Sequence, residues 1–104
     1  MLSRTADSLF WLARYVERAD NTARIIDAAN RLATLPLAYA GTSNEWESAL
    51  AAAGALRAFA ALGKEPNRDA VIDFLAFSPE NPSSIKTCVE IARNNSRAVR
   101  TALT

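Results

Sequence analysis

Four polar side chains near the start of the chain have the types and the spacing to form a small site. Arg14, Glu17, Asn21 and Arg24 occur in the run RYVERADNTAR. Residues three or four apart are neighbours on a helix surface, so Arg14 can pair with Glu17. By the same spacing Asp20 can pair with Arg24. Asn21 can bridge Glu17 and Arg24. Such a cluster offers a carboxylate as a general base and guanidinium groups that hold a carboxylate or a phosphate.

A structural explanation of the same cluster stays open. Other apolar residues lie on this side of the expected helix, which predicts that a second layer of helices covers it. A charge that is removed from water without a partner costs several kcal/mol, roughly, so covered charges must be paired. Ion pairs between helices would then account for Arg14, Glu17 and Arg24 without any ligand.

Many enzyme types are disfavoured by residues that the sequence lacks. It contains no histidine, one cysteine and three glycines. Without histidine, this chain cannot form a Ser-His or Cys-His pair or a zinc site that uses histidine. It also has no glycine-rich phosphate loop. We therefore expect no metal and no cofactor, which leaves carboxylate, arginine and hydroxyl chemistry.

Composition indicates one small domain. The 104 residues are 50% hydrophobic, and 12 basic residues nearly balance 11 acidic ones. This balance argues against binding to nucleic acid or to an anionic membrane. No uncharged apolar run approaches the ~18 residues of a membrane span, and the N-terminus resembles no signal peptide. The single cysteine, Cys88, falls in an apolar helical pattern and fits a reduced thiol. The sequence therefore predicts a cytoplasmic protein.

The chain is predicted to be all helical, because apolar residues recur at spacings of three and four almost throughout. The first helix should begin with Ser3 as its N-cap and run to about Thr34, before Pro36. Its predicted buried residues share one side of the helix: Leu9, Leu12, Val16, Ala19, Ala23 and Ile26.

Two further helices are predicted in the middle of the chain. A capping box at Thr42-Ser43-Asn44-Glu45 should open the second helix, and Gly63 should close it. We expect this helix to be partly exposed. Its apolar residues are Trp46, Leu50, Ala53, Leu56, Phe59 and Ala60, with Arg57 in the same seam. Asn67 should cap a third helix over residues 69–77, which is apolar on nearly every side and should be buried.

The last helix is predicted to start at Asn81 as N-cap, with Pro82 in the first helical position. Its expected core residues are Ile85, Cys88, Val89, Ala92, Val99 and Leu103, and its polar face comprises Lys86, Glu90, Arg93, Arg97 and Arg100. Arg93 and Arg97 could contact an anion or a partner protein, or the face could simply be solvated. Ser83 and Ser84 in the first turn could bind an anion, or could only cap the helix.

These elements predict a bundle of about four helices with a long N-terminal helix. The sequence ends at Thr104 within a helical pattern that has no glycine cap or proline stop. We expect residues 1–104 to form a single helical domain, the N-terminal portion of a larger helical protein. The uncovered helix faces could alternatively pair two copies of this chain.

Two longer blocks of sequence carry a resemblance to a known family. They are SRTADSLFWLARYVERADNTARIID at residues 3–27 and FLAFSPENPSSIKTCVEIARNNSRAVR at residues 74–100. Together they resemble the bacterial Alpha-E domain family, which is named for its helical fold and its glutamate-arginine motif. The resemblance places that motif on Glu17 and Arg18, with flanking arginines at Arg14 and Arg24. It also places a family loop motif on the run Asn81, Pro82, Ser83 and Ser84.

The resemblance implies partners and no established activity. Family members occur beside circularly permuted ATP-grasp proteins that resemble peptide ligases, and near transglutaminase-like proteins. They are also considerably longer than this chain. This sequence departs from the family pattern at Asn94, where an acidic residue is usual, and Asn94 cannot act as a general base.

Three functions are therefore considered. The first is an accessory helical module that engages an ATP-grasp-type ligase or its peptide. The second is an enzyme of peptide-bond formation or modification, with Glu17 as general base and Arg14, Arg18 or Arg24 holding an anionic group. The third is an oligomerising scaffold without a ligand.

Overall fold

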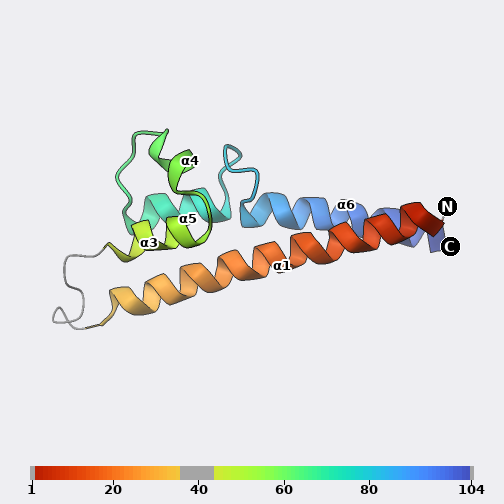
Figure 1. Ribbon diagram of the computed structural model, residues 1–104, viewed down its shortest axis with the longest axis horizontal. Coiled ribbons are helices and arrows are strands. Elements are labelled where there is room, and N and C mark those ends of the chain that lie inside the picture. The colour runs from red at the N-terminus through yellow and green to blue at the C-terminus, as the bar shows by residue number, and fades with distance from the viewer. Residues whose placement is uncertain (1, 36–43, 104) are drawn as a thin grey trace.

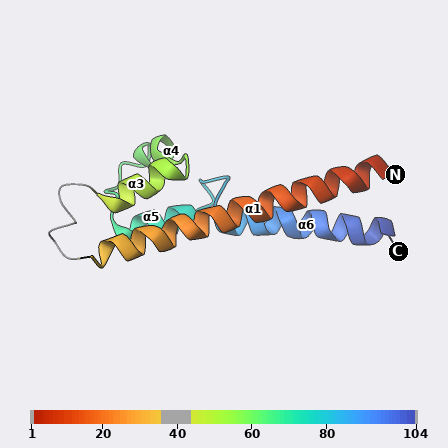
Figure 2. The same ribbon diagram turned by 60° about the horizontal axis from the view of Figure 1, so that its bottom comes forward.

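Two long helices that run side by side form the frame of the molecule (Figure 1). The computed structural model describes residues 2–35 and 44–103. Helix α1 spans Leu2–Ala33 and helix α6 spans Ile85–Leu103. They are antiparallel, so the two ends of the chain lie together at one tip, as both views show (Figure 2). The described parts of the chain contain only helices, which confirms the predicted all-α fold and its long N-terminal helix.

Three short helices pack together at the other end of the frame. They are α3 at Glu45–Ala52, α4 at Leu56–Ala60 and α5 at Arg68–Ala76. Helices α3 and α5 contact the C-terminal half of α1, α4 stands farther from α1, and the N-terminal half of α1 is paired with α6 alone (Figure 1). The molecule is elongated as a result, with extents of 57 × 26 × 17 Å. None of its described helices combines the length and the apolar character that membrane crossing requires.

The hydrophobic core lies within this group of short helices. Leu50 and Val71 are fully buried, and Phe59 meets Phe74 edge to face with ring centroids 5.5 Å apart. Burial of one such side chain contributes about 1.5–3 kcal/mol. The second predicted helix was expected to be partly exposed, and this is confirmed. Trp46, Leu50 and Phe59 are buried, although the neighbouring Leu56 is exposed.

The shielded residues of α1 follow a regular spacing of three and four along the whole helix. They are Thr5, Ser8, Leu12, Tyr15, Ala19, Thr22, Ile26 and Ala29, and Ile25 beside Ile26 is also partly buried. The same pattern recurs on α6 at Ile85, Cys88, Ala92, Asn95 and Val99, and Thr87 and Ile91 beside these positions are also partly buried. This 3.5-residue period is that of coiled-coil packing. Both seams contain small side chains such as Ser8 and Ala92. The pattern of large apolar residues alone therefore did not identify the seam positions.

The predicted seams are therefore only half right. Leu12, Ala19 and Ile26 are shielded as expected, but Leu9, Val16 and Ala23 are exposed. The observed seam of α1 lies beside the predicted one, because it follows the helix at positions occupied by Ser8, Tyr15 and Thr22. On α6, Cys88, Ala92 and Val99 are buried as predicted, whereas Val89 and Leu103 are exposed.

The predicted second helix is in fact two helices, because Gly54 ends the first of them. Gly54 has φ of +71°, a left-handed conformation that favours glycine. The Gly54 N–H donates to the Ala51 carbonyl at 3.1 Å, and the Ala55 N–H donates to the Leu50 carbonyl at 2.9 Å. This pair of hydrogen bonds is a Schellman motif. Gly63 also has φ of +71° and follows the end of α4, as predicted.

Asparagines cap α3 and α5, whereas the N-cap of α4 is Ala55, which makes no side-chain cap hydrogen bond. Glu45 is the first residue of α3 and not the third, so the helix does not begin with the predicted capping box. The Asn44 side chain accepts from the N–H groups of Trp46 and Glu47, and Asn67 accepts from Ala70. The predicted third helix is confirmed to within one residue at each end. Ser3 is not a cap, because α1 already begins at Leu2. Thr42 and Ser43 of the predicted capping box lie outside the described residues, as does Pro36.

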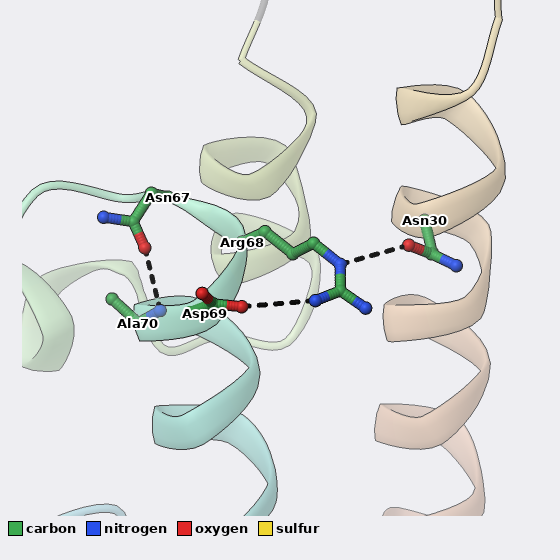
Figure 3. A network of polar contacts seen from close by, with 5 residues as sticks. All are labelled: Asn30, Asn67, Arg68, Asp69 and Ala70. Carbon is green, nitrogen blue, oxygen red and sulfur yellow. Dashed lines mark hydrogen bonds and ion pairs between the residues drawn. The ribbon is translucent and has the colours of Figure 1, made fainter.

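An arginine ties α5 to α1 in a way that the sequence did not indicate (Figure 3). Arg68 Nε donates to Asn30 Oδ1 at 3.4 Å, and its Nη1 lies 3.2 Å from Asp69 Oδ1. Asn67 caps α5 in the same turn. The first turn of α5 is thereby fixed against the C-terminal half of α1.

The substitution Gly54→Ala tests the break between α3 and α4. An added Cβ would meet no atom within 4 Å, so its effect is purely conformational. We expect a loss of about 1–2 kcal/mol in the free energy of unfolding, because alanine resists the left-handed conformation. Urea denaturation measures this change. A continuous helix over residues 42–63 would instead be stabilised by about 1 kcal/mol, since alanine is the better helix former.

Candidate functional site

The glutamate-arginine pair lies on an exposed face of α1. Arg14, Glu17, Arg18 and Asn21 line a shallow surface depression of about 230 Å³. Each of these four side chains is exposed. At roughly 100° per residue, Glu17 and Asn21 lie on the side of the helix opposite the shielded Ala19 and Thr22. We call Arg14, Glu17, Arg18 and Asn21 the outer edge of α1.

Only part of the predicted polar cluster is formed. Arg24 Nε lies 3.0 Å from Asp20 Oδ2, which confirms that predicted pair, although 79% of the Arg24 side chain is exposed. An exposed pair at this spacing contributes only about 0.3–0.5 kcal/mol. Among the described residues Glu17 has no ion pair or hydrogen bond. The predicted Arg14–Glu17 pair and the Asn21 bridge are therefore not formed.

Arg18 differs from its neighbours because it contacts aromatic rings. Its guanidinium carbon lies 5.3 Å from the centre of the Tyr15 ring, within the range of a cation–π interaction. The ring centroids of Tyr15 and Trp11 are 6.0 Å apart. The Trp11 and Phe10 rings meet edge to face, with centroids 5.1 Å apart. Phe10 and Trp11 are both exposed. The sequence analysis missed this row of aromatic residues, although the run FWLARY showed it. Aromatic and arginine side chains are enriched in protein interfaces.

Asn81 and Ser84 are used inside the chain. Asn81 Nδ2 donates to the Phe74 carbonyl at 3.0 Å, and Asn81 Oδ1 accepts from the Ser83 N–H at 3.1 Å. Ser84 Oγ accepts from the Thr87 N–H at 3.2 Å. The N-cap of α6 is therefore Ser84, and the prediction that Asn81 caps this helix was wrong. Both side chains are buried, which favours the structural explanation of the loop motif over an anion site.

Cys88 is a buried thiol on the seam between the two long helices. Burial raises the pKa of Cys88, and the positive charge of Arg18 opposes this by lowering the pKa. The Cys88 thiol also donates to the Ser83 carbonyl at 3.6 Å. The thiolate is disfavoured, as expected for an unreactive cysteine. The electrostatic coupling to Arg18 shows that the start of α6 lies alongside the middle of α1.

The polar face of α6 points away from α1. Lys86, Glu90, Arg93 and Arg97 are all exposed, and the shielded residues of α6 lie on the other side of the helix. Within the described residues Glu90 forms no ion pair with Lys86 or Arg93. Arg93 and Arg97 therefore lie at the opposite edge of the helix pair from Glu17. The predicted binding residues do not converge on one site.

A larger groove lies at the tip of the helix pair and was not predicted. Its volume is about 530 Å³, and its lining combines both helices: Arg4, Thr5, Asp7 and Ser8 from α1 and Ala98, Thr101 and Ala102 from α6. Most of these lining side chains are short, and Arg4 and Asp7 add one charge of each sign. In the described part of the chain, no group of three or more histidine, cysteine, aspartate or glutamate residues could hold a metal ion.

Comparison with known proteins gives one match. The model of the Alpha-E family, described as a predicted alpha-helical domain with a conserved ER motif, matches residues 1–104. Glu17-Arg18 is the single Glu-Arg dipeptide in the sequence. No curated protein and no solved structure gives a significant match.

The substitution Asn81→Ala tests the structural role of the loop motif. It leaves the Phe74 carbonyl and the Ser83 N–H without their partner in a buried position. We expect a loss of about 1–3 kcal/mol in the free energy of unfolding, measured by urea denaturation. Asn94→Ala, at an exposed position of α6, is the matched control and should change stability by less than about 0.5 kcal/mol. Equal effects of the two substitutions would contradict the assignment.

The pKa of Cys88 predicts a pH dependence of stability. The folded chain holds this thiol neutral to a higher pH than the unfolded chain does. Its stabilising contribution is therefore full below the ordinary thiol pKa and is lost as the pH rises toward the raised value. We expect the free energy of unfolding of wild type to fall more steeply at alkaline pH than that of Cys88→Ala. Parallel pH profiles of the two proteins would show that the thiol does not titrate differently in the fold.

Proposed function

The chain belongs to the Alpha-E family, and on this basis we propose that it is a noncatalytic helical module that binds a partner protein through the outer edge of α1. The observation that carries this proposal is the exposure of Glu17. The residue belongs to the motif by which the family is described, yet among the described residues it forms no ion pair or hydrogen bond. The carboxylate of the motif is therefore available for an external partner.

The surroundings of Glu17 support binding more than catalysis. A general base is usually tuned by burial or by neighbouring charges in an enclosed site. Glu17 instead lines a depression that is open to solvent, next to the exposed side chains of Arg14 and Arg18. The adjacent Phe10 and Trp11 add exposed aromatic surface. Opposite charges beside exposed aromatic rings are typical of a protein-binding surface.

The partner that we propose is a cytoplasmic ATP-grasp-type peptide ligase, with a transglutaminase-like protein as a further member of the same system. This choice rests on the resemblance of residues 3–27 and 74–100 to proteins found beside such ligases. The chemistry of the outer edge is compatible with it. Arg14 and Arg18 can pair with carboxylates of the partner, and Glu17 can pair with a basic group.

Binding of the chain to an ATP-grasp-type ligase, measured by isothermal titration calorimetry, tests the proposal. We expect Glu17→Gln and Arg18→Gln to weaken binding about tenfold or more, because each removes a charge from the contact. Arg97→Gln lies on the opposite edge and is the matched control, which should leave the affinity unchanged. Absence of binding by wild type, or equal effects of Arg97→Gln and Arg18→Gln, would refute the assignment of this surface.

Stability measurements separate a binding role of Glu17 from a structural one. Because Glu17 has no partner among the described residues, we expect Glu17→Ala to change the free energy of unfolding by less than about 0.5 kcal/mol. Urea denaturation of the chain alone provides this value. A loss of several kcal/mol, roughly the effect of unpairing a buried charge, would instead indicate a structural ion-pair network.

A further inference from the structure

One side of the α1–α6 pair carries large apolar side chains that the described residues leave uncovered. They are Leu2, Leu9 and Val16 on α1 and Val89 and Leu103 on α6, with exposed fractions of 88%, 48%, 52%, 53% and 72%. On α1 they are seven residues apart and form a strip along the helix. On α6 they are fourteen residues apart, with the exposed Ser96 at the position between them, and we call this set the strip on α6. The strip on α1 runs beside the seam that packs against α6. Helix α1 therefore has the residues for two packing seams.

The two strips lie on the same side of the helix pair. At roughly 100° per residue, the strip on α1 lies about 100° beyond the residues that face α6, in the direction of rising residue number. The strip on α6 lies about 70° beyond the residues that face α1, in the same direction. Because the helices are antiparallel, these rotations carry both strips to one side.

The two strips also occupy the same stretch along the length of the helix pair. Arg18 of α1 acts on Cys88 of α6, and Ser8 lines the same groove as Ala98. By this register Val16 lies level with Val89, and Leu2 lies level with Leu103. The strips therefore form one apolar face, two helices wide, which we call the open face.

The open face ends after Val16, because the same side of α1 becomes charged there. Beyond Val16, the same side of α1 carries Asp20 and Asp27. These pair with Arg24 at 3.0 Å and with Arg31 at 3.1 Å. The polar half of this side lies in the C-terminal half of α1, which the short helices also contact (Figure 1). The apolar half lies along the part of α1 that has α6 as its only neighbour.

We propose that the open face is the interface through which two copies of this chain form a dimer. Two helix pairs that stack by their apolar faces make a four-helix bundle. A seam on α1 about a quarter turn from its first seam is the geometry that such a bundle needs, because each helix then has two neighbours. A two-fold axis makes the contact closed, so association stops at two copies.

The shape and charge of the open face fit a second copy. Ala6 and Ala13 alternate with Leu2, Leu9 and Val16 along α1. If the two α1 helices cross antiparallel, Leu9 and Val16 of one copy can lie over Ala13 and Ala6 of the other, which fills space evenly. A parallel arrangement would place alanine against alanine and leave voids. The formal net charge of +1 per chain adds little repulsion between copies.

The size of the open face predicts a dimer that depends on concentration. Residues 2–16 of a helix are about 22 Å long, and two helices side by side are about 20 Å wide. This footprint of roughly 440 Å² per copy is about half the standard area per partner, which fits a weak and reversible contact. It lies on a different side of α1 from the outer edge, so dimerisation and ligase binding are separate properties.

Sedimentation equilibrium of the 104-residue chain tests the proposal. We expect wild type to dimerise reversibly, and Val16→Glu to raise the dissociation constant about tenfold or more, because it places a charge in the apolar contact. Leu32→Glu is the matched control, since Leu32 is 53% exposed on the same helix but lies off the open face. It should dimerise as wild type does. Circular dichroism confirms that each variant remains helical.

The substitution Ala13→Leu distinguishes a specific dimer from general hydrophobic association. It adds apolar area at an exposed position, so nonspecific association would become stronger. In the proposed dimer it removes the space that receives a side chain of the other copy, so dimerisation should become weaker. Wild type that remains monomeric into the millimolar range would overturn the proposal, as would Val16→Glu that dimerises normally. Either result leaves the proposed ligase contact unaffected.

Discussion

The packing of α1 against α6 is the interaction on which the rest of the structure depends. The two helices share a seam of 3.5-residue period that runs past the short helices to the tip of the molecule. Many residues in this seam are small or polar, including Ser8, Thr22 and Ala92. Hydrophobic burial per residue is therefore modest along the pair, and the large buried side chains are concentrated among α3, α4 and α5. The short helices fix one end of the frame, and the seam fixes the rotation of α1 along its length.

That rotation decides which residues of α1 face the solvent. With Ala19 and Thr22 turned inward, Glu17 and Asn21 must face outward, and Leu9 and Val16 must lie on a flank. The motif of the Alpha-E family is thus exposed by the same packing that leaves an apolar strip beside it. The outer edge, with mixed charges and neighbouring aromatic rings, is the basis of the proposed contact with a ligase. The open face carries exposed large apolar side chains from both long helices, which is the basis of the proposed dimer.

Sequence reasoning predicted the helical class, the long first helix and the limits of α5, because these follow from local signals such as periodicity and the Asn67 cap. It failed where tertiary packing decides. The seam of α1 was placed on Leu9 and Val16, since nothing local shows that α6 accepts serine and threonine instead. The break at Gly54 was masked by the surrounding alanines, although a glycine within a helical pattern is a signal for a C-terminal cap. The outward position of Glu17 could not be derived either, because it depends on the seam.

Cysteine scanning of residues 15–24 measures the rotation of α1 most directly. Single cysteines are introduced along the helix, and the rate of thiol labelling in the folded chain is compared with that in denaturant. Cys88 is buried and serves as an internal reference for a protected thiol. We predict fast labelling at positions 17, 18 and 21 and slow labelling at positions 19 and 22. Protection at positions 17 and 21, together with fast labelling at positions 19 and 22, would contradict the account.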